Sequence, residues 1–173
     1  MHCMQITKAR VYLLVFVIIA VYALVPIKIL SVRNEEGVTV FKQRVVNGTE
    51  FTYRFLHSYD RDWVEETFVI RKSHFNMARH RFRAFTYDAR ELTYPGDFYF
   101  EEGYGVVDNI EQHHETRMEK LDIRVARTVD QYLIVKGEQT SFSDLSQPGD
   151  LLTLEIKRQP RVFTFLSGKA MLI

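Results

Sequence analysis

The chain begins with an apolar run that carries no charge. Residues 11–25 read VYLLVFVIIAVYALV and follow directly on Lys8 and Arg10. At a rise of 1.5 Å per residue, a helix over residues 11–30 is about 30 Å long, which is the thickness of the apolar layer of a bilayer. Pro26 is acceptable in such a helix if it lies near one interface of the membrane. The pattern predicts a single transmembrane helix over residues 11–30.

Two other interpretations exist for this segment. Basic residues before a short apolar core are also typical of a cleaved signal peptide, although only a weak cleavage match, Val21-Tyr22-Ala23, is present. A buried helix of a globular domain needs a polar face, and none occurs before Lys28. The early basic residues place residues 1–10 in the cytoplasm. We therefore expect a single-pass cell-membrane protein with a linker at 31–37 and an extracytoplasmic domain at 38–173.

Beyond the linker, short alternating runs separated by turn residues are typical of strands. The runs are separated by pairs such as Pro95-Gly96 and Lys136-Gly137. Only residues 109–120 depart from this pattern, as a polar loop or one short helix. The expected strands are 38–46, 50–58, 63–71, 74–86, 97–107, 121–127, 131–136, 151–158 and 161–167. Because each sheet must bury one face, the sequence predicts an all-β fold, either an antiparallel β-sandwich or a barrel-like domain.

The Asn47-Gly48 pair predicts a hairpin between the first two of these strands. A two-residue turn, which this dipeptide usually forms, would place charged side chains opposite aromatic ones. A three-residue connection over residues 47–49 instead sets Val45 opposite Phe51 and keeps the apolar face uniform. The pattern favours the three-residue connection.

Composition and charge limit the classes of function. With 173 residues, 46% of them hydrophobic and 26% charged, the chain is long enough for one folded domain. The formal net charge of +1 gives no support for nucleic-acid binding, which usually requires a strong basic excess. The single cysteine, Cys3, excludes an intramolecular disulfide and a CxxC metal or redox motif. No cofactor is expected.

The stretch FLHSYDRDWVEETF, residues 55–68, places ionisable residues on both sides of a turn. A four-residue loop over 59–62 sets His57 opposite Val64. His57 and Glu66 are then the only ionisable pair on an otherwise apolar face, on a cross-strand diagonal of about 7 to 8 Å between backbones. Because an isolated buried carboxylate is costly, we expect Glu66 to take His57 as its partner.

The pair of His57 and Glu66 is open to three interpretations. Histidine and carboxylate suit acid/base chemistry, half of a metal site, or a buried hydrogen-bonded pair that fixes the turn. The structural interpretation is favoured, because no convincing nucleophile or oxyanion site accompanies the pair. Ser58 is adjacent to His57 and Glu65 is adjacent to Glu66, but strand alternation turns both to the opposite face.

Two further clusters contain candidate binding residues. Arg79, Arg81 and Arg83 alternate along one strand and form a basic ridge, which is either a solvated face or a surface for lipid headgroups or an acidic partner. His113-His114-Glu115 has metal-ligand residue types without a known zinc spacing. A solvated loop is favoured there, and no metal site is predicted.

The residues around the turn also resemble a known family. The pattern F-x-x-x-Y-x-H-S, a short break and V-E-E-x-F is similar to the signature of the bacterial domain of unknown function 1850 family. The resemblance covers about residues 35–158 and includes LDIRV at 121–125 and a late glycine followed by LLTLEI. Tyr59 and Trp63 stand where the family usually has valine and proline. The matching residues are Phe51, Phe55, His57, Ser58, Val64, Glu65, Glu66 and Phe68.

This resemblance sets the expected function. Such proteins look like small exported or membrane-anchored β domains, often encoded beside tripartite ATP-independent periplasmic transporters of the TAXI subtype, and their biochemical role is unassigned. We therefore expect a non-enzymatic accessory or binding protein held to the lipid bilayer by residues 11–30. Transporter permease or solute receptor subunits are its implied partners. The alternative is an extracytoplasmic hydrolase or metal-dependent enzyme that uses His57 and Glu66.

Overall fold

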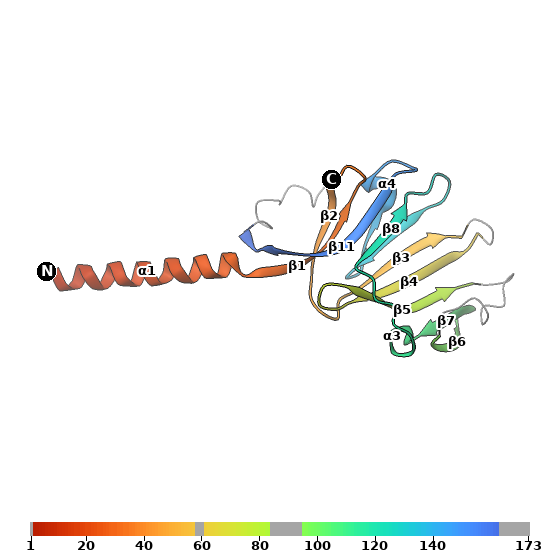
Figure 1. The fold of residues 1–173 in the computed structure, drawn as a ribbon, viewed down its shortest axis with the longest axis horizontal. Coiled ribbons are helices and arrows are strands. Elements are labelled where there is room, and N and C mark those ends of the chain that lie inside the picture. Colours follow the sequence, from red (N-terminus) through yellow and green to blue (C-terminus); the bar gives the residue numbers. More distant parts are fainter. Residues whose placement is uncertain (1, 58–60, 84–94, 163–173) are drawn as a thin grey trace.

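The computed structural model describes residues 2–57, 61–83 and 95–162, with side chains from Arg10 onward. A long N-terminal helix leads into two packed β-sheets (Figure 1). In chain order the elements are α1 (His2–Leu24), β1 (Pro26–Arg33), β2 (Thr39–Val45), β3 (Glu50–Leu56), β4 (Trp63–Ile70), β5 (Phe75–Phe82), β6 (Asp97–Glu101), β7 (Tyr104–Asp108), α3 (Ile110–His113), β8 (Lys120–Arg124), β9 (Gln131–Val135), β10 (Glu138–Ser141), α4 (Phe142–Leu145) and β11 (Leu151–Pro160).

The described strands form two antiparallel sheets, as predicted for an all-β sandwich. The four-stranded sheet has the order β2-β1-β11-β8, and the seven-stranded sheet has the order β10-β9-β3-β4-β5-β7-β6. The core lies between them, because alternate residues of each strand point to the partner sheet. Its largest fully buried side chains include Phe51, Phe68, Phe75, Phe142, Leu30, Leu133, Leu152 and Leu154.

The prediction of one helix over residues 11–30 is wrong in its second part. The helix ends at Leu24, and Pro26 begins strand β1 at the centre of the four-stranded sheet. Proline lacks a backbone N–H and disfavours helical geometry in the residue before it, so a helix ends readily at this point. The apolar run continues into β1 because Leu30 and Val32 belong to the core.

The expected linker at 31–37 is a strand end and a turn. Ser31 to Arg33 belong to β1, and the turn that follows is closed by hydrogen bonds between Asn34 and Val38. Strand β2 therefore pairs with β1. The predicted hairpin between β2 and β3 is wrong, because β3 pairs with β4 and β9 in the other sheet. The connection at 46–49 crosses from one sheet to the other.

The β3–β4 hairpin forms as expected but with a different register. Phe55 lies opposite Val64, and Tyr53 lies opposite Glu66. The predicted pairing of His57 with Val64 is therefore wrong by two residues. A shift of two preserves the division between the faces, because side chains alternate with a period of two. The loop is longer than four residues, because the last pair of the hairpin is Leu56 with Trp63. The His57 backbone N–H donates to the Asp62 carbonyl at 2.8 Å.

Other strand boundaries also differ from the expectation. The expected strand 97–107 is the hairpin of β6 and β7, and β10 follows the turn after β9 without having been predicted. Of the expected strand 161–167, Arg161 and Val162 are not strand residues, and the rest lies outside the described residues. The end of the strand predicted at 74–86 also lies outside them.

Candidate functional site

A row of polar residues crosses the inner, core-facing side of the seven-stranded sheet. Tyr53 of β3, Glu66 of β4 and His80 of β5 are direct cross-strand neighbours. Gln131 of β9 extends the row, because its amide Nε2 donates to the Tyr53 hydroxyl at 2.7 Å. The Gln131 Oε1 accepts from the backbone N–H of Ala126 at 2.7 Å. The sheet thus places four polar side chains beside aromatic and aliphatic ones.

Burial shifts the pKa of each ionisable member of this row in the direction that favours the uncharged side chain. Burial raises the pKa of Glu66 and lowers that of His80 to about 4. Burial also raises the pKa of Tyr53 to about 12, with the Gln131 hydrogen bond acting against the rise and the Glu66 charge adding to it. At neutral pH the His80 imidazole and the Tyr53 phenol are therefore neutral.

Glu66 thus has a histidine beside it, but it is His80 and not His57. Tyr53 is the residue opposite Glu66, so His57 is four residues further along the chain, about 13 Å at the rise of an extended strand. Ser58 lies outside the described residues. The acid/base or metal pairing of His57 with Glu66 loses its geometric basis in this register.

The outer face of the same sheet carries alternating arginine, carboxylate and aromatic groups. Glu65 lies between two arginines, 3.4 Å from Arg54 Nε and 3.5 Å from Arg81 Nη1, and its side chain is only 23% exposed. The Arg54 guanidinium stacks on Trp63 at 4.3 Å, and that of Arg81 stacks on Tyr104 at 3.7 Å. Glu65 does lie on the opposite face from Glu66, yet it is at the centre of a contact network and not in free solvent.

The basic ridge of Arg79, Arg81 and Arg83 lies on this outer face and is largely neutralised. Arg79 Nη2 donates to Asp108 at 2.7 Å, which raises the pKa of the arginine and lowers that of the carboxyl group. Arg83 lies 3.4 Å from Asp62. Because each arginine has an acidic neighbour, the ridge is a salt-bridged surface and offers little excess positive charge to an acidic partner.

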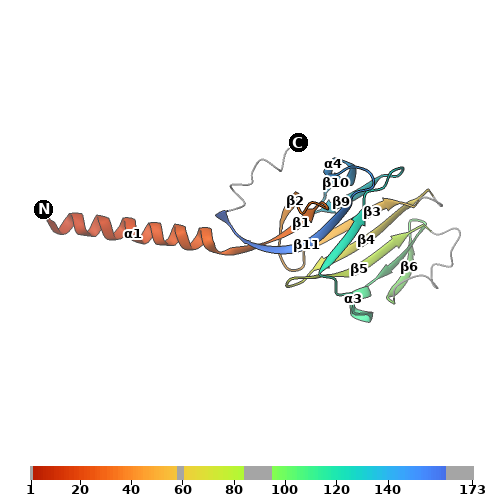
Figure 2. The same ribbon diagram turned by 45° about the horizontal axis from the view of Figure 1, so that its top comes forward.

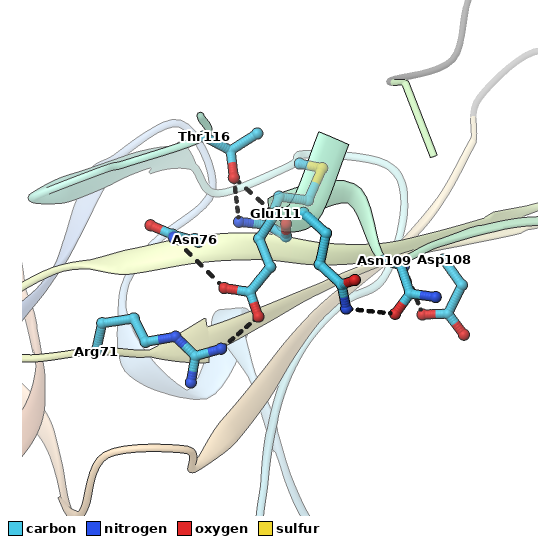
Figure 3. Close-up of polar contacts among 8 residues, drawn as sticks. Arg71, Asn76, Asp108, Asn109, Glu111 and Thr116 are labelled. Atoms are coloured by element: carbon cyan, nitrogen blue, oxygen red, sulfur yellow. Dashed lines mark hydrogen bonds and ion pairs between the residues drawn. The ribbon is translucent and has the colours of Figure 1, made fainter. Parts of the chain in front are cut away.

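The predicted cluster at residues 111–115 is divided between different contacts. Figure 3 shows the Glu111 carboxylate between the Arg71 guanidinium, with which it forms an ion pair, and the Asn76 amide, which donates at 3.4 Å. His113 contacts Asp97 at 3.4 Å instead. No group of three potential metal ligands occurs in the parts of the chain that the structure describes.

The surface of α1 is a further candidate. Large apolar side chains point outward on every side of the helix, and each is 47–73% exposed. The exposed residues are Val11, Tyr12, Leu13, Leu14, Val15, Phe16, Val17, Ile18, Ile19, Val21, Tyr22 and Leu24. Within residues 2–57, 61–83 and 95–162, no helix is both long enough and apolar enough to qualify as a membrane span. The helix extends away from the sandwich in both views (Figures 1 and 2).

Sequence reasoning missed the partners of Glu66 and Glu65. Alternation in residues 79–83 does place His80 on the apolar face, so a register that paired this strand with the preceding one would have identified it. Tyr104 gave no comparable signal, because its contact with Arg81 depends on β7 lying beside β5, and the order of non-consecutive strands is not encoded in local periodicity.

Comparisons with known proteins add no assignment. No family model matches the chain, and neither a curated protein nor a solved structure matches it. The resemblance to the domain of unknown function 1850 family stays a prediction.

Proposed function

We propose that this protein is a membrane-anchored β-sandwich whose helix α1 inserts in a lipid bilayer and whose sandwich acts outside the cytoplasm as a non-enzymatic accessory or binding domain. The observation that carries the proposal is the apolar surface of α1, which is exposed on all sides. A helix that is apolar all round is normally buried in a protein core or in a membrane. The sandwich does not cover α1, so its apolar side chains are best accommodated by the lipid of a membrane.

The length of the apolar run constrains how α1 inserts. The helical part of the apolar run, residues 11–24, is about 21 Å long, which is shorter than the apolar layer of about 30 Å. Local thinning of the bilayer and extension of Arg10 toward the headgroups reduce this mismatch. Pro26 and strand β1 follow at once, so the sandwich would lie directly against the membrane surface.

Extraction from membranes tests the insertion of α1. The full chain should stay with membranes in alkaline carbonate, whereas Ile18→Asp, which puts a charge at the centre of the apolar run, should shift it to the soluble fraction. A charged residue at the helix centre costs about 3 kcal/mol on insertion scales. The control is Lys42→Asp, a charge change within β2. Release of the unaltered chain by carbonate, or a mature N-terminus near Leu24, would refute the anchor.

Cysteine labelling tests the orientation. Cys3 is the only cysteine, so a membrane-impermeant maleimide applied to intact cells should not label it if the N-terminus is cytoplasmic. In a Cys3→Ser chain, Glu102→Cys in the exposed β6–β7 turn should be labelled from outside. The reverse pattern would contradict an extracytoplasmic sandwich.

The accessory role and its partners come from the family resemblance. A transporter permease or a solute receptor of the TAXI type is the proposed partner, and the outer face around Glu65 is the surface we assign to it. Crosslinking in native membranes should join Trp63→Cys or Tyr132→Cys to such a subunit. The same probe at Val38, which is exposed in the β1–β2 turn, should give no such product. Equal crosslinking at all three positions would contradict a specific surface.

A further inference from the structure

The end of the sandwich from which α1 emerges gathers basic side chains. Figures 1 and 2 show α1 joining the sandwich where β1 begins and β11 ends. Lys28 and Arg158 are cross-strand partners there, and Arg44 and Lys157 flank the next residue of β1. Lys72 is at the same end, because the Lys28 Nζ donates to the backbone carbonyl of its neighbour Arg71 at 3.4 Å. We call the five residues Lys28, Arg44, Lys72, Lys157 and Arg158 the basic end.

The basic end has little negative charge to balance it. Lys157 pairs with Glu155 at 2.9 Å. In the described parts of the chain, no carboxylate lies within ion-pair distance of Lys28, Arg44, Lys72 or Arg158. Burial and the neighbouring Arg158 charge lower the pKa of Lys28. Like charges held side by side are unfavourable, so an anion at this end would be stabilised.

Direct contacts attach the basic end to the apolar helix. The Arg161 guanidinium stacks over the Tyr22 ring of α1 at 4.2 Å. The Arg161 backbone N–H donates to the carbonyl of Val25 at 3.3 Å. The cationic surface and the exposed apolar surface therefore adjoin, and Arg161 with Tyr22 marks the boundary between them.

The opposite end of the sandwich also carries carboxylates. Glu35 and Glu36 lie in the turn between β1 and β2, and Glu35 accepts from the N–H of Leu151 at the start of β11, 2.9 Å away. Asp130 and Asp150 lie in the connections before β9 and β11. Arg124 and Arg127 lie at this end too, so it carries charges of both signs, whereas the basic end gathers cations.

We propose that the basic end binds anionic lipid headgroups at the membrane surface into which α1 inserts. The inference rests on the proposed function, because it needs α1 in the bilayer. Clusters of lysine and arginine immediately cytoplasmic of a membrane helix are attracted to the anionic lipids of that leaflet, and the same attraction acts at an outer surface that contains anionic lipids. A lipid surface also satisfies the adjoining apolar side chains of α1, which a soluble anion does not contact.

A fluorescence experiment tests this proposal on the full chain. A Cys3→Ser, Val46→Cys chain carries a bimane label in the exposed loop beside Lys28. It is reconstituted in vesicles of phosphatidylcholine alone or mixed with phosphatidylglycerol, each with a headgroup spin label as quencher. We expect stronger quenching in the anionic vesicles, and less at high salt, because salt screens exposed charges.

Removing cations from the basic end should undo this quenching. For Lys72→Gln with Arg158→Gln, we expect the ratio of docked to undocked protein to fall roughly fivefold for each cation removed. The matched control is Arg124→Gln with Arg127→Gln, which makes the same charge change in exposed residues at the opposite end of the sandwich. This control should keep the quenching of the unaltered chain, and circular dichroism verifies the folding of both double variants.

Three results would overturn the proposal and are distinct from one another. Equal quenching in both kinds of vesicle, with the protein incorporated in each, rejects the headgroup site while leaving the anchor intact. Equal loss of quenching in both double variants rejects a localised site in favour of total charge. Failure of the unaltered chain to incorporate in either vesicle rejects the anchor itself and the site with it.

Discussion

At the scale of single residues, the two faces of the seven-stranded sheet treat adjacent glutamates differently. Glu66 faces the core, where burial raises its pKa, while Glu65 faces outward between Arg54 and Arg81. Consecutive strand residues point to opposite faces. The negative charge of Glu66 is therefore unfavourable in the core, whereas the negative charge of Glu65 is favourable between two arginines. The two positions should therefore respond oppositely to loss of charge.

The first prediction compares Glu66→Gln with Glu65→Gln at pH 8. A raised folded-state pKa means that the Glu66 contribution is fully present below its unfolded value and is lost as pH rises through the folded value. A neutral glutamine side chain at this position avoids the loss, so the free energy of unfolding should stay the same or rise. Glu65→Gln should lower it by up to about 1 kcal/mol, because two partly exposed ion pairs weaken. Urea denaturation of both variants measures the difference, and an equal decrease in both would contradict the assigned faces.

The second prediction concerns His80 and acid. Its pKa is lowered from 6.5 to about 4, so its contribution is present above pH 6.5 and is lost as pH falls toward 4. This loss is on the order of 2 to 3 kcal/mol. His80→Gln should therefore flatten the fall in stability between these pH values, as measured by denaturation at each pH. His114→Gln, at an exposed position, serves as the control. Identical pH profiles for the two variants would show that His80 titrates freely.

At the scale of elements, strand β1 separates what local pattern can and cannot predict. The approximate limits of most strands follow from alternation and turn residues, since these signals act over a few positions, but β1 and β10 are not among the predicted strands. The sequence pattern predicts a helix up to residue 30, because short apolar runs are compatible with a buried strand or a helix. Pro26 was the local signal that distinguishes them. Pairing with β2 and with the distant β11 stabilises this segment as a strand.

The candidate site was predictable to a similar extent. Alternation correctly placed Glu66 on the apolar face, but its predicted partner, His57, is wrong, because the neighbouring histidine is His80 of β5. The identity of that histidine depended on a loop length that polar residues around the turn do not fix. The ion pairs of Glu65 required the position of β5, which belongs to sheet topology. Local chemistry was therefore predictable, and its partners across strands were not.

The third prediction tests the position of β1 in the core. Leu30 is fully buried, so Leu30→Ala should lower the free energy of unfolding by about 2 to 5 kcal/mol, through lost burial and a cavity. Val38→Ala, at a side chain 54% exposed in the next turn, should change it by less than about 0.5 kcal/mol. Thermal or urea unfolding of the full chain in detergent measures both. Were residue 30 in a lipid-embedded helix, its truncation would leave the sandwich as stable as before.

At the scale of the whole molecule, α1 and the sandwich adjoin but differ in the exposure of their apolar side chains. The sandwich hides its own between two sheets, whereas α1 leaves its apolar side chains exposed. Strand β1 joins the two parts, because it is continuous with the helix in sequence and central in the four-stranded sheet. A force or displacement at the helix would therefore act on the core directly, and the boundary between the parts lies at Val25 and Pro26.

The last prediction uses this boundary. Deleting residues 2–24 should release a folded sandwich into the soluble fraction, because every strand remains and the exposed apolar helix is gone. Deleting residues 2–33 should abolish folding, since β1 lies between β2 and β11 and supplies Leu30 and Val32 to the core. Cooperative melting followed by near-ultraviolet circular dichroism distinguishes the two products. A cooperative transition in the longer deletion would show that β1 is dispensable. Membrane retention of the shorter one after a salt wash would show that a part other than α1 holds the protein to lipid.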